Sequence, residues 1–170
     1  MSERKKKKSV PKNRNESCVA TGRKRAMTIG ISGRVPEVSR AEIRQWVRTI
    51  LQHLDQTQAE LSLALVTDPE IHVLNRQYRG KDKPTDVLSF PLADALQPLL
   101  LGDVVISIET AARQARRRGH ALQEELQTLL IHGVLHLLGY DHAVSRRAAI
   151  RMHRKEREVK TVLAIRVGTR

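Results

Sequence analysis

One stretch of the chain, residues 124–138, is apolar almost all the way round when it is wound into a helix. Its apolar side chains fall on every side rather than on one stripe: Leu126, Leu129, Leu130, Ile131, Val134, Leu135, Leu137 and Leu138. A helix on the surface of a domain has an apolar stripe on one face only, whereas a helix that is apolar all round is buried. The sequence therefore predicts a central helix with other elements packed around it.

Two histidines interrupt this apolar helix. His132 and His136 are four residues apart, which places them on one face, one turn apart. Gly139 can end the helix in a left-handed conformation, and His142 then returns towards the same point. A single histidine on an apolar helix is usually a core residue. Two histidines on one face, with a third six residues after the second, favour a metal site instead. Three imidazoles leave one position of a tetrahedral zinc open, as in catalytic sites.

The spacing of these histidines also occurs in one large class of metalloproteases. Those enzymes carry a glutamate directly after the first histidine, where it acts as the general base. Gly133 occupies that position here and has no side chain. The sequence therefore argues against peptide hydrolysis while leaving the metal site intact. Spacing alone does not separate zinc from nickel or copper.

The remaining periodicity predicts a sheet and several further helices. Ser39 and Glu42 form a capping box, and Asp68 is a candidate cap for the helix that follows it. We expect strands at residues 28–32, 61–66, 87–90 and 103–106, and further helices near residues 43–51, 71–78, 110–118 and 145–165. The predicted fold is α+β of the α/β type: a small, mixed, mostly parallel four-stranded sheet packed by helices, with a buried central helix that carries the metal site.

Charge divides the chain into two parts. Residues 1–26 contain ten lysines and arginines and two glutamates, and they supply most of the net charge of +13. We expect residues 1–26 to form a disordered basic tail and residues 27–170 to form a single metal-dependent domain. The positive charge favours RNA as a partner, although a basic tail can also be only a solvated arm. No run is long enough to span a membrane, and the lone Cys18 fits a cytoplasmic location.

Three blocks of the sequence resemble the YbeY family of single-strand-specific endoribonucleases. The first is His-Gly-x-Leu-His-Leu-x-Gly-Tyr-Asp-His at residues 132–142. The second runs from Leu74-Asn75 through Tyr78-Arg79-Gly80-Lys81-Asp82-Lys83-Pro84-Thr85-Asp86-Val87-Leu88-Ser89-Phe90-Pro91, and the third is residues 101–107. A weaker similarity follows at Met152 and Glu156. The blocks are in the family order and cover most of residues 60–160.

The resemblance implies a zinc-dependent endoribonuclease that acts on ribosomal RNA at the 16S 3′ end and in ribosome quality control. One Zn²⁺ per chain is expected on His132, His136 and His142. Arg79 and His132 are the expected catalytic residues, and Arg79, Lys81 and Lys83 are the expected RNA-binding residues. An arginine suits this role because its guanidinium offers paired donors to a phosphate. The expected partners are single-stranded and ribosomal RNA, the ribosome or its small subunit, and ribosomal or GTPase proteins.

Several alternatives remain open at this level. The metal could be mainly structural in a ribosome-associated assembly factor, or the domain could hydrolyse another substrate. Asp86, Asp103 and Asp141 are candidates to orient a ligand histidine, but each could equally cap a turn or a strand end. Only four aromatic residues are present, so we do not expect an array of base-stacking platforms. RNA binding should therefore depend mainly on charge and on salt concentration.

Overall fold

The computed structural model describes residues 26–92, 97 and 99–167. Almost all of the predicted basic tail therefore lies outside the described residues. The elements follow in the order β1 (Thr28–Ser32), α1 (Arg40–His53), β2 (Glu60–Val66), α2 (Asp68–Arg79), β3 (Val87–Pro91), β4 (Leu100–Ser107), α3 (Ile108–Arg118), α4 (Leu122–Leu137) and α5 (Arg146–Val167).

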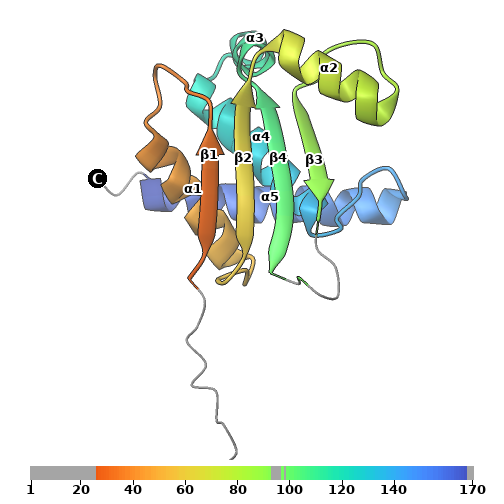
Figure 1. The fold of residues 1–170 in the computed structure, drawn as a ribbon. Helices are drawn as coiled ribbons and strands as arrows, with labels where there is room; N and C mark the ends of the chain where they lie inside the picture. The colour runs from red at the N-terminus through yellow and green to blue at the C-terminus, as the bar shows by residue number, and fades with distance from the viewer. Residues whose placement is uncertain (1–25, 93–96, 98, 168–170) are drawn as a thin grey trace, which may run out of the picture.

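The four strands form one mixed sheet in the order β1-β2-β4-β3 (Figure 1). The strands β1, β2 and β4 run parallel to one another, and β3 pairs with β4 in the antiparallel direction. The outer side of β3 is an edge of this sheet. The predicted fold class, a small and mostly parallel sheet packed by helices, is confirmed.

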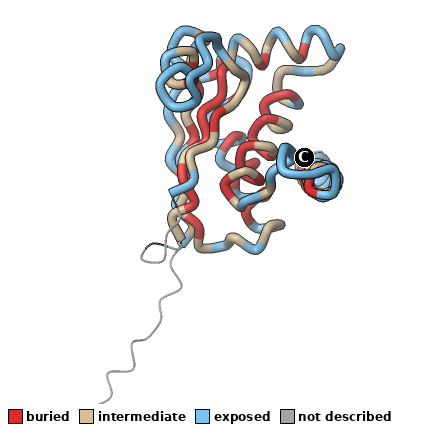
Figure 2. The backbone as a smooth tube through the Cα atoms, turned by 90° about the vertical axis from the view of Figure 1, so that its right-hand side faces the viewer, coloured by how far each residue is buried: buried red, intermediate tan, exposed pale blue. Residues whose placement is uncertain are grey.

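Alternating side chains divide the core into two parts. Leu61, Leu63 and Leu65 of β2 face the larger cluster, which α1, α4 and α5 also enter. The opposite face of the sheet carries a small cluster centred on Ile71 of α2 and Leu88 of β3. Figure 2 shows α4 beside the sheet and α5 outside it, so the helices on that face form two layers. Period-two alternation along the strands produces this arrangement.

The central position predicted for residues 124–138 is confirmed in α4. This helix contacts α1, α3, α5, β3 and β4. Gly133 is the point of closest approach, because a Cβ atom built there would lie 2.7 Å from Val104 Cγ1 and 3.3 Å from Ser89 Oγ. The missing side chain lets α4 pack directly on β3 and β4, and the histidines beside it are thereby held near the edge of the sheet.

Two local predictions were wrong. The N-cap of α2 is Thr67, which forms a capping box with Glu70, and Asp68 lies inside the helix. The Asp68 carboxylate instead accepts hydrogen bonds from Ser107, Thr110 and Arg113, so it joins α2 to α3. Strand β4 also begins at Leu100 rather than at residue 103.

The capping box of Ser39 and Glu42 at the start of α1 is present as predicted. Among the described helices, none has the length and apolar character needed to cross a membrane.

Candidate metal centre

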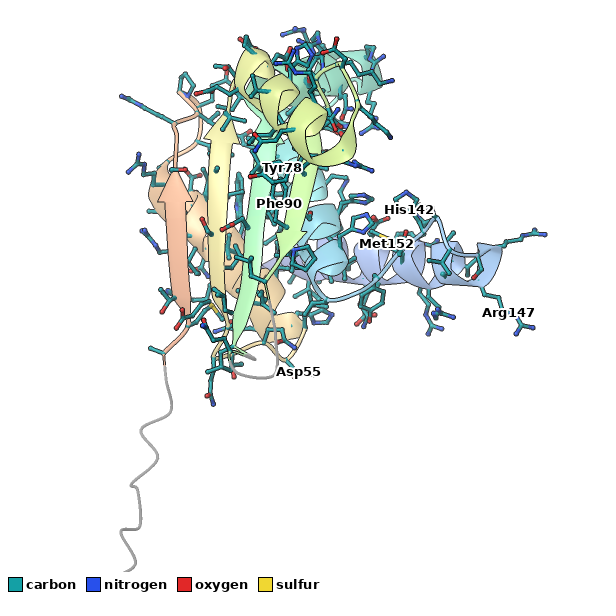
Figure 3. All side chains as sticks on the ribbon, turned by 45° about the vertical axis from the view of Figure 1, so that its right-hand side comes forward. Asp55, Tyr78, Phe90, His142, Arg147 and Met152 are labelled. Carbon is teal, nitrogen blue, oxygen red and sulfur yellow. The ribbon has the colours of Figure 1, made fainter. Side chains whose placement is uncertain are left out.

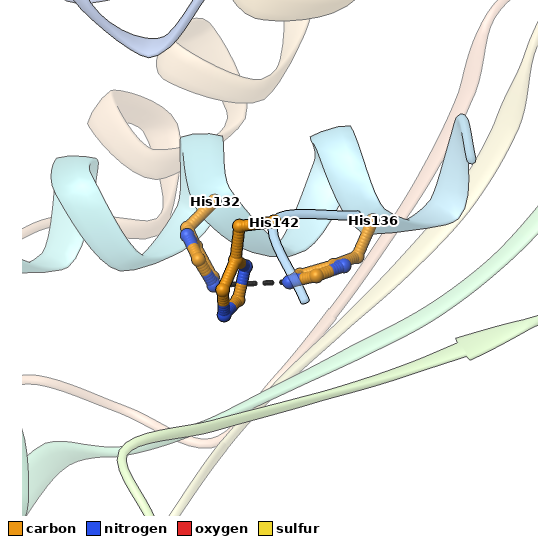
Figure 4. A group of neighbouring side chains, drawn as sticks. All are labelled: His132, His136 and His142. Carbon is orange, nitrogen blue, oxygen red and sulfur yellow. Dashed lines mark hydrogen bonds between the residues drawn. The ribbon is translucent and has the colours of Figure 1, made fainter. Parts of the chain in front are cut away.

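Three histidine side chains converge at the C-terminal end of α4 (Figure 4). His132 and His136 lie on one face of α4, and His142 lies on the loop that follows it. One ring nitrogen from each residue lies within 4.8 Å of the other two. The Nε2 atoms of His132 and His136 are 3.1 Å apart and are joined by a hydrogen bond. The predicted histidines are therefore brought together by the fold.

The return of His142 towards α4 has a clear local cause. Gly139 has φ +81°, a left-handed conformation that a glycine adopts without strain. The backbone N–H groups of Gly139 and Tyr140 then donate to the carbonyls of His136 and Leu135, at 3.0 Å each. In the next turn the Asp141 carboxylate accepts a hydrogen bond from the backbone N–H of Ala143 at 2.8 Å. These contacts end the helix and turn the chain back at His142.

A carboxylate fixes the proton of one of these histidines. His132 donates from Nδ1 to Oε1 of Glu156 on α5, at 2.7 Å. His153 lies 2.9 Å from the other oxygen of the same carboxylate. Because the Nδ1 proton of His132 is held by Glu156, the Nε2 atom of His132 is free of that proton and faces the other two histidines. Histidine ligands of metal ions are commonly oriented in this way.

Two of the aspartates considered from the sequence have other partners. Asp86 accepts hydrogen bonds from Gln114 and from the backbone of Val87, and Asp141 accepts one from the backbone of Ala143 in the turn that contains His142. Glu156 was missed as the orienting group, although it belongs to the weaker similarity at the end of the family pattern. The contact depends on α5 crossing α4, which residue spacing does not encode.

The electrostatics of the centre favour a neutral imidazole at His136 and a charged carboxylate at Glu156. Burial lowers the pKa of His136, and the neighbouring His132 and His142 lower it further, while Asp141 partly opposes this effect. Burial alone would raise the pKa of Glu156, but hydrogen bonds from His132 and His153 outweigh it, so the net change lowers that pKa. A neutral imidazole is the form that binds a metal ion.

The donor set fits a zinc ion. Two nitrogens at zinc-ligand distance from a tetrahedral ion are about 3.3 Å apart, which is close to the 3.1 Å between His132 Nε2 and His136 Nε2. His142 is more exposed and completes a set of three nitrogens, and the carboxylate of Glu156 supplies the outer support. Histidines alone are also suitable ligands for nickel or copper.

The three histidines line one wall of a cleft of about 670 Å³. Tyr78 and Arg79 from the last turn of α2 also line the cleft, together with residues 85–91, which include all of β3. The fold thus places Arg79 in the same cleft as the histidines. Lys81 and Lys83 are exposed on the loop after α2 and do not line this cleft.

Gly133 has a further consequence for the chemistry of the cleft. The residue after the first histidine faces Val104 and Ser89 of the sheet, where a side chain has no room. A glutamate at this position would meet the packed strands and would not reach a substrate. The structure therefore agrees with the sequence in giving no support to peptide hydrolysis.

The fold and the cleft together define a class of protein: a small α/β domain with a three-histidine, glutamate-supported centre in a cleft that also contains an arginine. The family model described as Endoribonuclease YbeY matches residues 31–164. Similar proteins with that name include one from Aquifex aeolicus, 50% identical over 107 residues, which cover 62% of this chain and 71% of the relative. Another, from Anaeromyxobacter sp. (strain Fw109-5), is 48% identical over 136 residues and covers 78% of this chain and 70% of the relative.

A solved structure shows a similar fold. The solution structure of TM1509 from Thermotoga maritima superposes with a TM-score of 0.62 at 26% identity, over 84% of this chain and 93% of the other. The chain belongs to the YbeY endoribonuclease family. It is therefore an enzyme of the RNA-cleaving hydrolase class, as the resemblance of the three sequence blocks predicted.

Proposed function

We propose that the cleft cleaves single-stranded RNA with one zinc ion held by His132, His136 and His142. The observation that carries this proposal is the convergence of three histidine nitrogens within 4.8 Å, in a cleft that Arg79 also lines. When bound, a zinc ion there would act as a Lewis acid on a phosphate oxygen and would lower the pKa of a coordinated water. Nickel and copper are the alternatives for the same ligands.

The proposed task of Arg79 is to hold the scissile phosphate. Its guanidinium carries a permanent positive charge and can donate two parallel hydrogen bonds to phosphate oxygens. The arginine lies at the C-terminal end of α2, and the left-handed Gly80 directly after it turns the chain away. Charge that develops on the phosphate during cleavage would be stabilised by this donor.

The other proposed roles follow from position. Glu156 keeps the His132 proton on Nδ1, so that Nε2 remains available as a ligand. Lys81 and Lys83, which lie outside the cleft, would contact RNA phosphates away from the point of cleavage. We propose ribosomal RNA as the substrate, with action at the 16S 3′ end and in ribosome quality control. The ribosome or its small subunit, and ribosomal or GTPase proteins, are the proposed partners.

A cleavage assay with two matched RNAs tests this function. One RNA carries the single-stranded 16S 3′ sequence, and the other carries the same sequence annealed to its complement. Wild-type protein should cut the single strand much faster than the duplex, and Arg79→Ala should lose most of this activity while Arg44→Ala, on the exposed side of α1, retains it. Equal cleavage by Arg79→Ala and wild type would refute the role of Arg79.

The ends of the products separate two routes of cleavage. Attack by water breaks the phosphodiester directly and leaves an open phosphate at one new end and a hydroxyl at the other. Attack by the adjacent 2′-hydroxyl instead leaves a 2′,3′-cyclic phosphate and a 5′-hydroxyl. Mass spectrometry of the fragments distinguishes these products, and RNA binding without any new ends would favour the assembly-factor alternative.

A further inference from the structure

Tyr78 is an exposed aromatic residue in the wall of the cleft. Its exposed fraction is 59%, whereas Trp46 in the core is 3% exposed. A large ring that remains in contact with water loses the stabilisation that burial would give it. Because Tyr78 also lines the cleft, its exposed ring is available to a ligand that enters there.

Phe90 holds the ring of Tyr78 in place. The ring centroids are 5.0 Å apart and the planes are inclined at 69°, an edge-to-face arrangement. Such pairs of aromatic rings attract each other beyond simple area burial. An edge-to-face contact uses one edge and one face of the two rings, so at least one face of Tyr78 is not covered by Phe90. The position of Phe90 is itself fixed, because it pairs with Asp103 in the sheet.

Both rings lie beside the residues proposed to act on the phosphate. Tyr78 and Phe90 line the same cleft as Arg79, His132 and His142. Figure 3 shows Tyr78 at the end of α2 next to Phe90, with His142 on the loop before α5. Because Tyr78 and Arg79 line the same cleft, a nucleotide whose phosphate is held by Arg79 would have its base, or the base of its neighbour, within reach of Tyr78.

We propose that Tyr78, supported by Phe90, stacks on one base of the RNA next to the scissile phosphate. This inference rests on the proposed function, since it assumes that RNA enters this cleft. Every base has a flat face, so the contact would tolerate different sequences. A base inside a duplex is covered on both faces by its neighbours, and it must leave the stack to reach Tyr78. The aromatic pair would thereby select for single-stranded RNA.

Binding of a fluorescent RNA tests the stacking directly. The probe is a single-stranded 2′-O-methyl RNA that carries 2-aminopurine at one position, with a separate oligonucleotide for each position and with integrity checked on a denaturing gel. Stacking on an aromatic ring quenches 2-aminopurine. Wild-type protein should quench it at one position, and Tyr78→Ala should abolish this quenching and weaken binding about tenfold, within the range for one stacked base.

Conservative variants separate stacking from a structural role. Tyr78→Phe and Tyr78→Trp keep a ring and should retain the quenching and the affinity, whereas Tyr78→Leu keeps only apolar volume and should lose both. Val73→Ala serves as a matched control, because Val73 is an exposed apolar residue of the same helix, 51% exposed, that does not line the cleft. Circular dichroism of each variant verifies that the helices are retained.

The outcomes distinguish this inference from the proposed function. If wild type cleaves RNA but Tyr78→Ala binds and quenches the probe as wild type does, the stacking is refuted and the nuclease function stands. If Tyr78→Leu behaves as Tyr78→Phe does, the residue acts through apolar volume and the stacking is again refuted. If wild type neither binds nor cleaves RNA, the proposed function fails and the inference fails with it.

Discussion

His132 of α4 and Glu156 of α5 meet in a hydrogen bond of 2.7 Å between Nδ1 and Oε1, although 24 residues separate them in the chain. The side chain of Glu156 is about one quarter exposed, and it remains charged because its two histidine partners lower its pKa. Helix α5 thus supplies a group to the candidate metal centre in addition to its packing on α1 and α4.

Removal of this carboxylate should weaken metal binding. In Glu156→Ala the Nδ1 proton of His132 loses its acceptor, so the ring is free to rotate or to move its proton to Nε2. We expect zinc affinity to fall about 10- to 100-fold, as is usual when such a supporting group is removed. A chelator competition titration measures this change, and Glu156→Gln should lose less because its carbonyl oxygen can still accept a hydrogen bond from His132 Nδ1.

Glu158→Ala is the control for this experiment. Glu158 lies on the same helix but pairs with His53 and Lys155, away from the three clustered histidines. Its removal should leave zinc affinity unchanged. If Glu156→Ala also binds zinc as wild type does, the carboxylate does not orient His132 towards a metal.

The close packing at Gly133 gives a prediction for stability. In Gly133→Ala the new Cβ would meet the stiff, branched side chain of Val104 at 2.7 Å. Alanine favours a helix over glycine by about 1 kcal/mol, but overpacking in a rigid core costs about 1–3 kcal/mol, and we expect the overpacking to dominate. Urea denaturation should show a lower free energy of unfolding for the variant.

A second substitution tests the cause of that loss. Val104→Ala removes the atoms that the new methyl group meets, so Gly133→Ala should cost less in this background than in wild type. The double-mutant cycle gives the coupling free energy. Strictly additive effects would show that Gly133 and Val104 do not limit the approach of α4 to the sheet.

Asp68 gives a prediction for the pH dependence of stability. Burial raises its pKa, but hydrogen bonds from Arg113, Ser107 and Thr110 lower it more, to about 2. Because the folded pKa lies below the ordinary value, the charged form stabilises the fold fully above about pH 4, and this contribution is lost as the pH falls towards 2. Asp68→Asn should therefore cost about 1–2 kcal/mol at neutral pH, allowing for its partial exposure.

Denaturation at several pH values measures this effect. The difference in free energy of unfolding between wild type and Asp68→Asn should shrink below pH 4. Glu37→Gln, at an exposed site with no part in this contact, is the control. A difference that stays constant from pH 7 to pH 2.5 would contradict the assignment of a depressed pKa to Asp68.

The parts of the site that the sequence predicts are those formed within one continuous segment. His132, His136 and His142 lie within eleven residues, and helical periodicity with a left-handed Gly139 is enough to bring them together. Glu156 depends on how α5 crosses α4, and the ring pair of Tyr78 and Phe90 depends on how α2 lies over β3. Such contacts follow from tertiary packing, which residue spacing does not record.

In the fold, too, the features that follow from local sequence are predicted, and those that depend on tertiary contacts are not. Alternating leucines in β2 and the all-round apolar character of α4 predict the sheet and its central helix. The sequence predicts Asp68 as the cap of α2, whereas the N-cap is Thr67, one residue earlier. Both are good capping residues, and the contacts that Asp68 makes with α3 cannot be read from the sequence. Glu125 also has a role that depends on tertiary packing. It lies in the first turn of α4, yet its side chain is fully buried and forms an ion pair with Arg118.

The most direct test of the account measures metal content and RNA cleavage in the same preparations of untagged protein. Wild type should carry one zinc ion per chain by elemental analysis and should cut single-stranded RNA, and chelation should stop the cleavage until zinc is restored. His136→Ala should remain folded, carry little zinc and lose cleavage. Full cleavage by His136→Ala, or by wild type stripped of metal, would contradict the claim that the three histidines form a metal-dependent RNA-cleaving centre.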